Sequence, residues 1–224
     1  MGSTTMRIVL TRPEGANDAL ARRLEAEGFD AVECPLIRIE PLDGGPVRAE
    51  SYDWLVLTSR NAVEYLFRRL EGSLPRVAVV GPGTAEALRG RGVEPALVAR
   101  RPTQEGLLAE LPRPAGRVLF AGAEGARDVL VRELGADFVP LYRTAELPSA
   151  ELPEGDLVVL ASASAARALA ATRTDLPCVS IGLVTSAEAR RLGLDVVAEA
   201  ASPDVDGLVE AIKLAVSNIA SSPS

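Results

Sequence analysis

The stretch YDWLVLTSRNAVEYL at residues 52–66 returns in altered form as GDLVVLASASAARAL at residues 155–169. In both stretches an aspartate precedes a run of aliphatic residues, and a serine stands six positions after the aspartate. The first copy continues with apolar residues at the spacing of one helix face, namely Val63, Leu66, Phe67 and Leu70. We therefore predict that each copy forms a buried strand followed by a helix, the repeating unit of parallel α/β sheets.

Further matches extend this similarity into an internal repeat. The serines Ser59 and Ser162 are each followed, after a gap of similar length, by a glycine at the end of an apolar run, Gly81 and Gly182. RPTQEGLLAEL at 101–111 matches SPDVDGLVEAI at 202–212, and RIVLTRPEGANDALARRL at 7–24 matches RVLFAGAEGARDVLVREL at 117–134. The copies run over 7–111 and 117–216. Either each copy forms its own domain, or the copies exchange their first strand–helix units, because both arrangements bury the same faces.

The composition excludes several classes of protein. With 224 residues and 47% hydrophobic content, the chain has enough apolar residues for one large or two small cores. It contains no histidine, which argues against a histidine-based triad or a zinc site, so we expect no metal. A net charge of −7 argues against a nucleic-acid partner. The two cysteines, Cys34 and Cys178, lie in apolar runs and are predicted to be buried free thiols.

The sequence also predicts the location of the protein. MGSTTMRIVL at the start lacks the long apolar segment of a signal peptide, and no stretch is apolar enough for a membrane span. We therefore expect a cytoplasmic protein with no membrane association.

Candidate ligand-binding residues follow the predicted strands, because parallel sheets bind ligands beyond the carboxyl ends of their strands. The turns concerned are 11–13, 58–61, 81–84, 122–125, 162–164 and 182–185. Helix starts there would offer free N–H groups to an anion, so that an acidic protein could bind a polyanion without a basic patch. The alternative is that these residues are helix caps, with Pro13 in a first helical turn. The candidates are Thr11, Arg12, Thr58, Ser59, Arg60, Asn61, Gly81, Thr84, Ser162, Ser164, Gly182 and Thr185.

Tyr142 is a candidate for chemistry because a phenol can donate a proton to a leaving hydroxyl. The alternative is an aromatic side chain that packs at a domain junction. Nucleotide binding is disfavoured, since GPGTAE at 81–86 has Glu86 where the dinucleotide fingerprint needs its third glycine. The only lysine, Lys213, follows no phosphate-binding loop.

Six blocks, in order along the whole chain, resemble the uroporphyrinogen-III synthase family. They are IVLTRP at 8–13, PLIRIEP at 35–41, LVLTSRNAV at 55–63, VAVVGPGTAEAL at 77–88, LYRTAEL at 141–147 and SPDVDGLVEAI at 202–212. The resemblance implies two similar flavodoxin-like α/β domains, each a parallel sheet flanked by helices, linked by two crossing β-strands. Residues 1–37 with 146–224 would form one domain, 43–138 the other, and 38–42 with 139–145 the linker. The active site would lie in the cleft between the domains.

The resemblance also implies a reaction. A lyase of tetrapyrrole (haem, sirohaem or cobalamin) biosynthesis would cyclise hydroxymethylbilane, an octacarboxylate, to uroporphyrinogen III. Ring D is inverted and water is lost, with no cofactor. The enzyme would be a monomer that receives its substrate from hydroxymethylbilane synthase.

By the same resemblance, Tyr142 would assist departure of the hydroxyl. Thr58, Ser59, Thr84, Ser162 and Thr185 would contact the substrate, and we add Arg12, Arg60 and Arg143 as carboxylate partners. The sequence departs from the family pattern at 182–184, where proline and threonine commonly follow the glycine.

Two other functions remain open at this point. One is a non-catalytic two-domain binding protein for a small polyanionic ligand, and the other is a sugar-nucleotide transferase.

Overall fold

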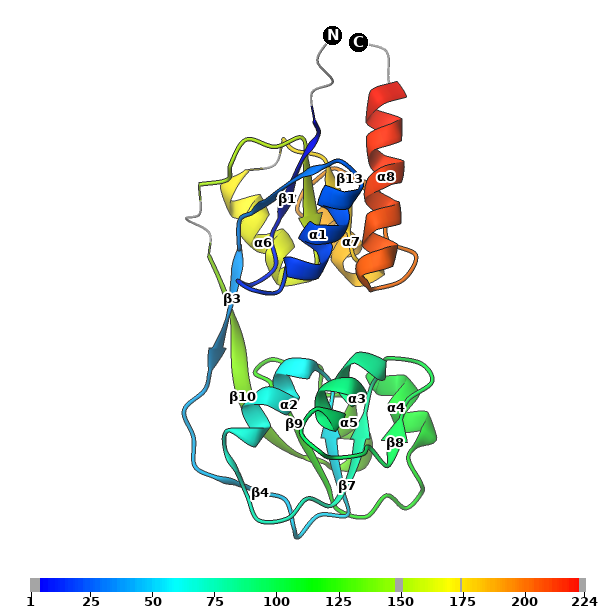
Figure 1. Ribbon diagram of the computed structural model, residues 1–224. Helices are drawn as coiled ribbons and strands as arrows, with labels where there is room; N and C mark the ends of the chain where they lie inside the picture. Colours follow the sequence, from blue (N-terminus) through cyan, green and yellow to red (C-terminus); the bar gives the residue numbers. More distant parts are fainter. Residues whose placement is uncertain (1–4, 148–150, 174, 222–224) are drawn as a thin grey trace. The chain divides into compact units, whose positions relative to one another are not determined.

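The computed structural model describes residues 5–147, 151–173 and 175–221 (Figure 1). The chain divides into two compact units, one within residues 1–38 and 145–224 and the other within residues 39–144. Each unit contains a sheet with a five-stranded parallel part and helices on both faces, and the second sheet has one further, antiparallel strand at its edge. The predicted α/β class is therefore confirmed.

The sheet of the first unit has the strand order β13-β12-β11-β1-β2, and its paired strands are all parallel. Its strands are β1 (Arg7–Leu10), β2 (Asp30–Glu33), β11 (Leu157–Leu160), β12 (Cys178–Ser180) and β13 (Val196–Glu199). Its helices are α1 (Asp18–Ala26), α6 (Ala163–Thr172), α7 (Leu183–Arg191) and α8 (Val205–Ser221).

Alternating strand residues face opposite layers of helices in this unit. Ile8 and Leu10 pack with residues of α1 and α8, which lie side by side in Figure 1. Val9 lies between them in sequence and packs with residues of α6 and α7 on the other face. Both faces of the sheet are therefore buried, as the uninterrupted apolar runs predict.

The second unit has the strand order β3-β10-β9-β5-β7-β8. Its strands are β3 (Ile37–Pro41), β5 (Trp54–Leu57), β7 (Arg76–Val79), β8 (Leu97–Val98), β9 (Val118–Ala123) and β10 (Asp137–Glu146). Helices α2 (Arg60–Phe67) and α3 (Pro82–Arg89) cover one face, and α4 (Gln104–Glu110) and α5 (Val129–Leu134) cover the other. Two short strands, β4 (Val47–Arg48) and β6 (Leu70–Glu71), pair separately.

The strand orders decide between the two arrangements that the repeat leaves open. The order β2-β1-β11-β12-β13 in one sheet corresponds to β10-β9-β5-β7-β8 in the other. Each sheet therefore joins the first strand–helix unit of one copy to the later strands of the other copy. The copies exchange their first units.

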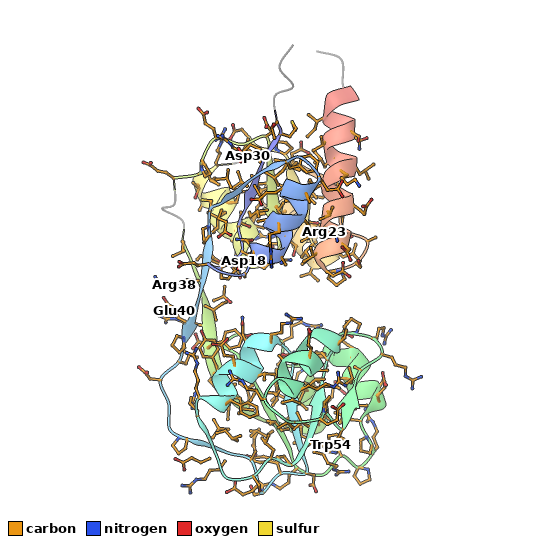
Figure 2. All side chains as sticks on the ribbon, viewed as in Figure 1. Asp18, Arg23, Asp30, Arg38, Glu40 and Trp54 are labelled. Atoms are coloured by element: carbon orange, nitrogen blue, oxygen red, sulfur yellow. The ribbon has the colours of Figure 1, made fainter. Side chains whose placement is uncertain are left out.

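The chain passes between the units along β3 and β10, which are neighbours in the second sheet. Leu42 N–H donates to the Leu141 carbonyl at 3.0 Å, and Leu147 N–H donates to the Leu36 carbonyl at 2.8 Å, so the two segments run antiparallel. Figure 2 labels Glu40 on β3, where its carboxylate accepts a hydrogen bond from Arg143 of β10 at 2.8 Å.

Two predictions of local structure have definite outcomes. Cys34 and Cys178 are buried free thiols, as predicted. Helix α1 begins only at Asp18, so the prediction that Pro13 occupies a first helical turn is wrong. None of the helices in the described part of the chain combines the length and apolar character needed to cross a membrane.

Candidate functional site

Each unit brings its predicted site residues to the carboxyl edge of its own sheet. In the first unit, Thr11 and Arg12 follow β1, and the candidates at 162–164 and 182–185 follow β11 and β12. In the second unit, the candidates at 58–61 and 81–84 follow β5 and β7. The strands concerned are parallel neighbours, so their carboxyl ends meet at one edge. Tyr142 of β10 reaches the same edge of the second sheet, where it pairs with Ala123, the last residue of β9.

The helix starts at these edges are of two kinds. The Ser59 hydroxyl accepts a hydrogen bond from Ala62 N–H at 3.0 Å, and the Ser162 hydroxyl accepts one from Ala165 N–H at 3.1 Å. Both serines are therefore N-caps of α2 and α6. In contrast, α3 and α7 begin at Gly81 and Gly182 without a side-chain cap. A side-chain cap thus takes up one of the first N–H groups of α2 and one of α6, whereas no side chain caps the first N–H groups of α3 and α7.

Tyr142 is held in a defined position at the edge of the second sheet. Its hydroxyl lies 2.8 Å from the Ser59 hydroxyl, and its ring stacks on Tyr65 with centroids 5.5 Å apart. The side chain is only 6% exposed. Burial raises the pKa of Tyr142 above the usual value of a phenol, and the hydrogen bond with Ser59 partly opposes this rise. The phenol is therefore protonated at neutral pH.

Two hydrogen-bond arrangements are open to this pair, because Ser59 already accepts from Ala62 N–H and either hydroxyl can donate to the other. If Tyr142 donates, the hydrogen of Ser59 is free for another acceptor. If Ser59 donates, the phenol hydrogen is free. Ser59 is half-buried and thus more exposed than Tyr142, so it is the end of the pair that is open to a ligand.

Three candidate threonines have buried side chains. Thr11 is fully buried, and its hydroxyl donates to the Val159 carbonyl at 2.6 Å. Thr84 and Thr185 are 7% and 5% exposed within α3 and α7. Thr58, in contrast, is half-buried, as are Asn61 and Ser164. Ser164 accepts a hydrogen bond from Arg167 at 3.0 Å.

The three arginines proposed as carboxylate partners differ in their surroundings. Arg60 is exposed and pairs with Glu86 at 2.7 Å, and Arg143 pairs with Glu40 at 2.8 Å. Arg12 is half-buried and has no ion-pair partner among the residues that the structure describes. Burial lowers the pKa of the Arg12 guanidinium from its usual value. Of the three, Arg12 is the one whose charge is not already neutralised by a carboxylate.

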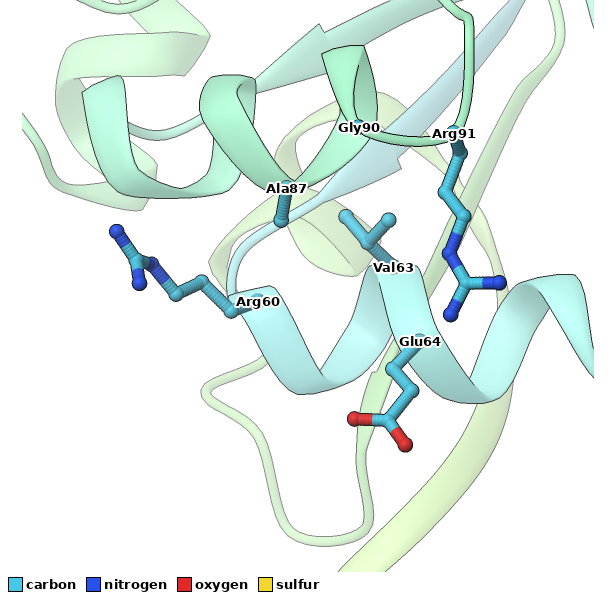
Figure 3. Close-up of a pocket in the computed structure, with 6 residues that line it drawn as sticks. All are labelled: Arg60, Val63, Glu64, Ala87, Gly90 and Arg91. Carbon is cyan, nitrogen blue, oxygen red and sulfur yellow. The ribbon is translucent and has the colours of Figure 1, made fainter. Parts of the chain in front are cut away.

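A groove of about 270 Å³ lies between α2 and α3 (Figure 3). Arg60 and Arg91 stand at its two ends, and Val63 and Ala87 lie between them. Arg60, which is one of the candidate residues, thus also lines this groove. Among the described residues, no cluster of three cysteine, aspartate or glutamate side chains is placed to hold a metal ion.

One buried polar cluster escaped the sequence analysis. The Ser186 hydroxyl of α7 donates to the Glu199 carboxylate at the end of β13, and it lies 2.5 Å from the Ser180 hydroxyl at the end of β12. The only signal in the sequence is Ser180 within the apolar run CVSIG and Glu199 directly after the apolar residues VVA. Tyr65, which stacks on Tyr142, was also missed, because its place on a predicted helix gave no reason to select it.

Comparison with known proteins agrees with this architecture. The profile of the family described as "Uroporphyrinogen-III synthase HemD" matches residues 18–210. The uroporphyrinogen-III synthase of Synechococcus elongatus is 30% identical over 177 residues, which cover 70% of this chain and 66% of that protein. A Methanocaldococcus jannaschii relative is 30% identical over 151 residues, 63% of each chain. The matched part of the chain therefore spans slightly less than two thirds of these relatives.

Solved structures show the same fold. The crystal structure of uroporphyrinogen-III synthetase from Helicobacter pylori superposes with a TM-score of 0.68 at 18% identity, covering 95% of this chain and 100% of that chain. The resemblance found in the sequence is thus confirmed by the family profile. The chain belongs to the uroporphyrinogen-III synthase family.

Proposed function

We propose that this protein cyclises hydroxymethylbilane to uroporphyrinogen III, with inversion of ring D and loss of water. The observation that carries the proposal is the family match over residues 18–210, which includes both candidate edges except the turn at 11–12. A non-catalytic polyanion-binding protein is the competing function, and it would need no proton donor at either edge.

Hydroxyl departure is assigned to the pair formed by Ser59 and Tyr142. The carbon–oxygen bond of the hydroxymethyl group breaks, and the oxygen leaves as water once a proton has been delivered to it. Tyr142 is protonated at neutral pH and lies 2.8 Å from Ser59. Because Tyr142 is 6% exposed, we assign the contact with the leaving oxygen to Ser59, with Tyr142 donating in turn to Ser59.

Carboxylate binding is assigned to the uncapped helix starts and to Arg12. The first N–H groups of α3 and α7 have no side-chain cap, and each helix start carries partial positive charge. Arg12 adds a full charge that no carboxylate of the described residues pairs with. Thr58, Asn61 and Ser164, which are half-buried, supply hydroxyl and amide groups at the same edges.

We further propose that the protein acts as a cytoplasmic monomer and receives its substrate from hydroxymethylbilane synthase. Light scattering on the purified chain tests the first point, with 23.5 kDa expected. A coupled assay tests the second. Direct transfer predicts less of the spontaneous isomer when the synthase is present than when the same amount of hydroxymethylbilane is added from solution.

The central experiment is an isomer assay with freshly made hydroxymethylbilane. Spontaneous closure yields the uninverted isomer, so chromatography of the products separates catalysis from background. The proposal predicts uroporphyrinogen III as the main product with the native protein and the uninverted isomer with heat-denatured protein. If native protein binds hydroxymethylbilane but leaves only the uninverted isomer, the polyanion-binding function replaces the one proposed.

A further inference from the structure

Three polar side chains link the start of α7 to the sheet beneath it. Ser180 and Ser186 are 0% and 1% exposed, and Glu199 is half-buried. Ser186 donates its single hydrogen to Glu199, so in the 2.5 Å contact Ser180 must donate to Ser186. Ser180 and Glu199 are also register partners on neighbouring strands. The chain of hydrogen bonds therefore ties the helix to the carboxyl ends of β12 and β13.

The second unit provides an internal comparison for this cluster. Val79 and Val98 are the register partners that correspond to Ser180 and Glu199. Ala85 stands four residues after Gly81, as Ser186 stands four residues after Gly182. All three corresponding residues are apolar. The second unit therefore has the same topology without these hydrogen bonds. An apolar trio at the three positions is not expected to be less stable than the hydrogen-bonded cluster.

The two helices also differ in how their first turns are held. Helix α3 has Pro82 at its first position, where the ring fixes φ and no N–H is needed. Helix α7 has Leu183 and Val184 instead, which are 77% and 78% exposed and contribute little packing. Neither helix has a side-chain cap. The first turn of α3 thus has Pro82, and the first turn of α7 has the hydrogen bonds of Ser186 in its stead.

We propose that Ser186 and Glu199, together with Ser180, are positioning residues that hold the first turn of α7 in the geometry that binds a substrate carboxylate. This inference rests on the proposed function, which assigns carboxylate binding to the free N–H groups of that turn. None of the three side chains needs to contact the substrate. They act through the helix, as Pro82 does in α3.

The test transfers the apolar trio of the second unit into the first, as Ser180→Val, Ser186→Ala and Glu199→Val together. The first intrahelical amide, Ser186 N–H, donates to the Gly182 carbonyl at 3.0 Å in the native protein. In the triple variant we expect hydrogen exchange at amides 186–188 to accelerate at least tenfold. The KM for hydroxymethylbilane should rise about fivefold, the size expected for loss of one helix-terminus contact, with kcat nearly unchanged.

A rescue separates positioning from general damage. Leu183→Pro added to the triple variant gives α7 the first residue of α3, and it should restore slow exchange and lower the KM to that of Leu183→Pro alone. Leu183→Pro alone should leave exchange at amides 186–188 unchanged, and it is the reference for KM because the substitution itself removes the Leu183 N–H. Glu199→Gln keeps an acceptor oxygen for Ser186 and should stay within twofold of the native KM. If the triple variant does not fold, Ser186→Ala with and without Leu183→Pro provides the same comparison.

Each outcome has a defined meaning. Unchanged exchange in the triple variant would overturn the positioning role. Faster exchange with a native KM would show that α7 is held as described but does not bind substrate, which overturns the functional half of the inference. A raised KM that Leu183→Pro does not restore would also overturn it. The exchange measurement needs no turnover, so a protein that makes no uroporphyrinogen III would defeat the proposed function and leave the structural half testable.

Discussion

The two units share one strand order and differ in a few side chains at the carboxyl edges of their sheets. Both place a capping serine at the helix that follows the central strand, Ser59 in the second unit and Ser162 in the first. Among the described residues only Ser59 has a tyrosine partner, because the segment PLYR at 140–143 carries Tyr142 where PLIR at 35–38 carries Ile37. One difference at a corresponding position thus gives the second unit a serine–tyrosine pair and leaves the first unit with the serine.

A second difference concerns α3 and α7. The start of α3 lies on an apolar trio and contains Pro82, whereas the start of α7 lies on the hydrogen-bonded cluster of Ser180, Ser186 and Glu199. The comparison teaches that duplication supplies two equivalent backbones, and that local side-chain chemistry then determines what each edge can do. In the function proposed here, both edges bind carboxylates and only the second unit delivers a proton.

The largest effect is expected from Tyr142→Phe, which would make the second edge resemble the first. The variant removes the hydroxyl that pairs with Ser59 and keeps the stacked ring, so kcat should fall by roughly 10²-fold while the protein remains folded. The isomer assay measures turnover, and circular dichroism measures thermal unfolding. Tyr65→Phe is the matched control, because its hydroxyl has no hydrogen-bond partner among the described residues. Native turnover in Tyr142→Phe would remove Tyr142 from the mechanism.

The next largest effect is expected from the paired variants Ser59→Ala and Ser162→Ala. Each variant removes one N-cap, so each should destabilise its own unit by about 1 kcal/mol. Only Ser59→Ala should also reduce kcat, by up to the roughly 10²-fold expected for Tyr142→Phe, since Tyr142 acts through Ser59. Denaturant unfolding and the isomer assay measure the two quantities. Equal turnover in the two variants would show that both serines are caps and nothing more.

A smaller effect is expected from Pro82→Leu, which gives α3 the first residue of α7 without the hydrogen-bonded cluster beneath it. The first turn of α3 would lose its fixed φ, and the KM for hydroxymethylbilane should rise about threefold with little change in kcat. Steady-state kinetics provides the measurement. Adding Val79→Ser, Ala85→Ser and Val98→Glu should reverse the rise if the cluster and the proline are interchangeable. A native KM in Pro82→Leu would show that α3 does not need a fixed first turn.

The smallest expected effect concerns pH and distinguishes the stabilities of the two units. Burial raises the pKa of Cys178 to about 12 and also raises that of Cys34, and both thiols lie in the core of the first unit. The unfolded chain loses these protons near pH 9 and the folded chain does not, so the free energy of unfolding of the first unit should fall as pH rises above about 9. The loss is at most about 1.4 kcal/mol per pH unit for one thiol.

Thiol labelling is the measurement for this last prediction. Neither cysteine should react with an aromatic disulfide reagent in the folded protein at pH 8, and labelling should report unfolding of the first unit alone. Ser162→Ala should then accelerate labelling, whereas Ser59→Ala should not. Rapid labelling of the native protein would contradict the burial of both thiols.

Much of the local structure could be predicted from the pattern of apolar and polar residues in the sequence. The aliphatic runs and the helical spacing after Ser59 predict a strand and a helix, and β5 and α2 occupy these residues. The N-cap alternative for Ser59 and Ser162 is correct because a serine hydroxyl satisfies an N–H group only three residues away. The start of α1 was misplaced, since an N-terminal helix boundary depends on the turn at 13–17 more than on the apolar stripe that follows.

The contacts at the candidate site could not be predicted in this way. Ser59 and Tyr142 are 83 residues apart in sequence, and nothing local brings their hydroxyls to 2.8 Å. Ser186 and Glu199 lie on different elements, 13 residues apart in sequence, and neither position gave any indication of its partner. The family resemblance selected Tyr142 and Ser59 separately and did not pair them.

Most strands and helices, the duplication and the family could be predicted from the sequence, because these depend on local propensity, on periodicity and on the order of short blocks. The strand order of the structure shows that the copies exchange their first strand–helix units, an arrangement that the family resemblance implied and that the residue pattern alone left open. The structure also shows which serine has a tyrosine partner and which helix start is tied to the sheet. A strand buries the same two faces whichever copy it pairs with, so the hydrophobic pattern does not specify its neighbouring strand. Hydrogen bonds between residues distant in sequence depend on that strand pairing and therefore cannot be predicted from the pattern either.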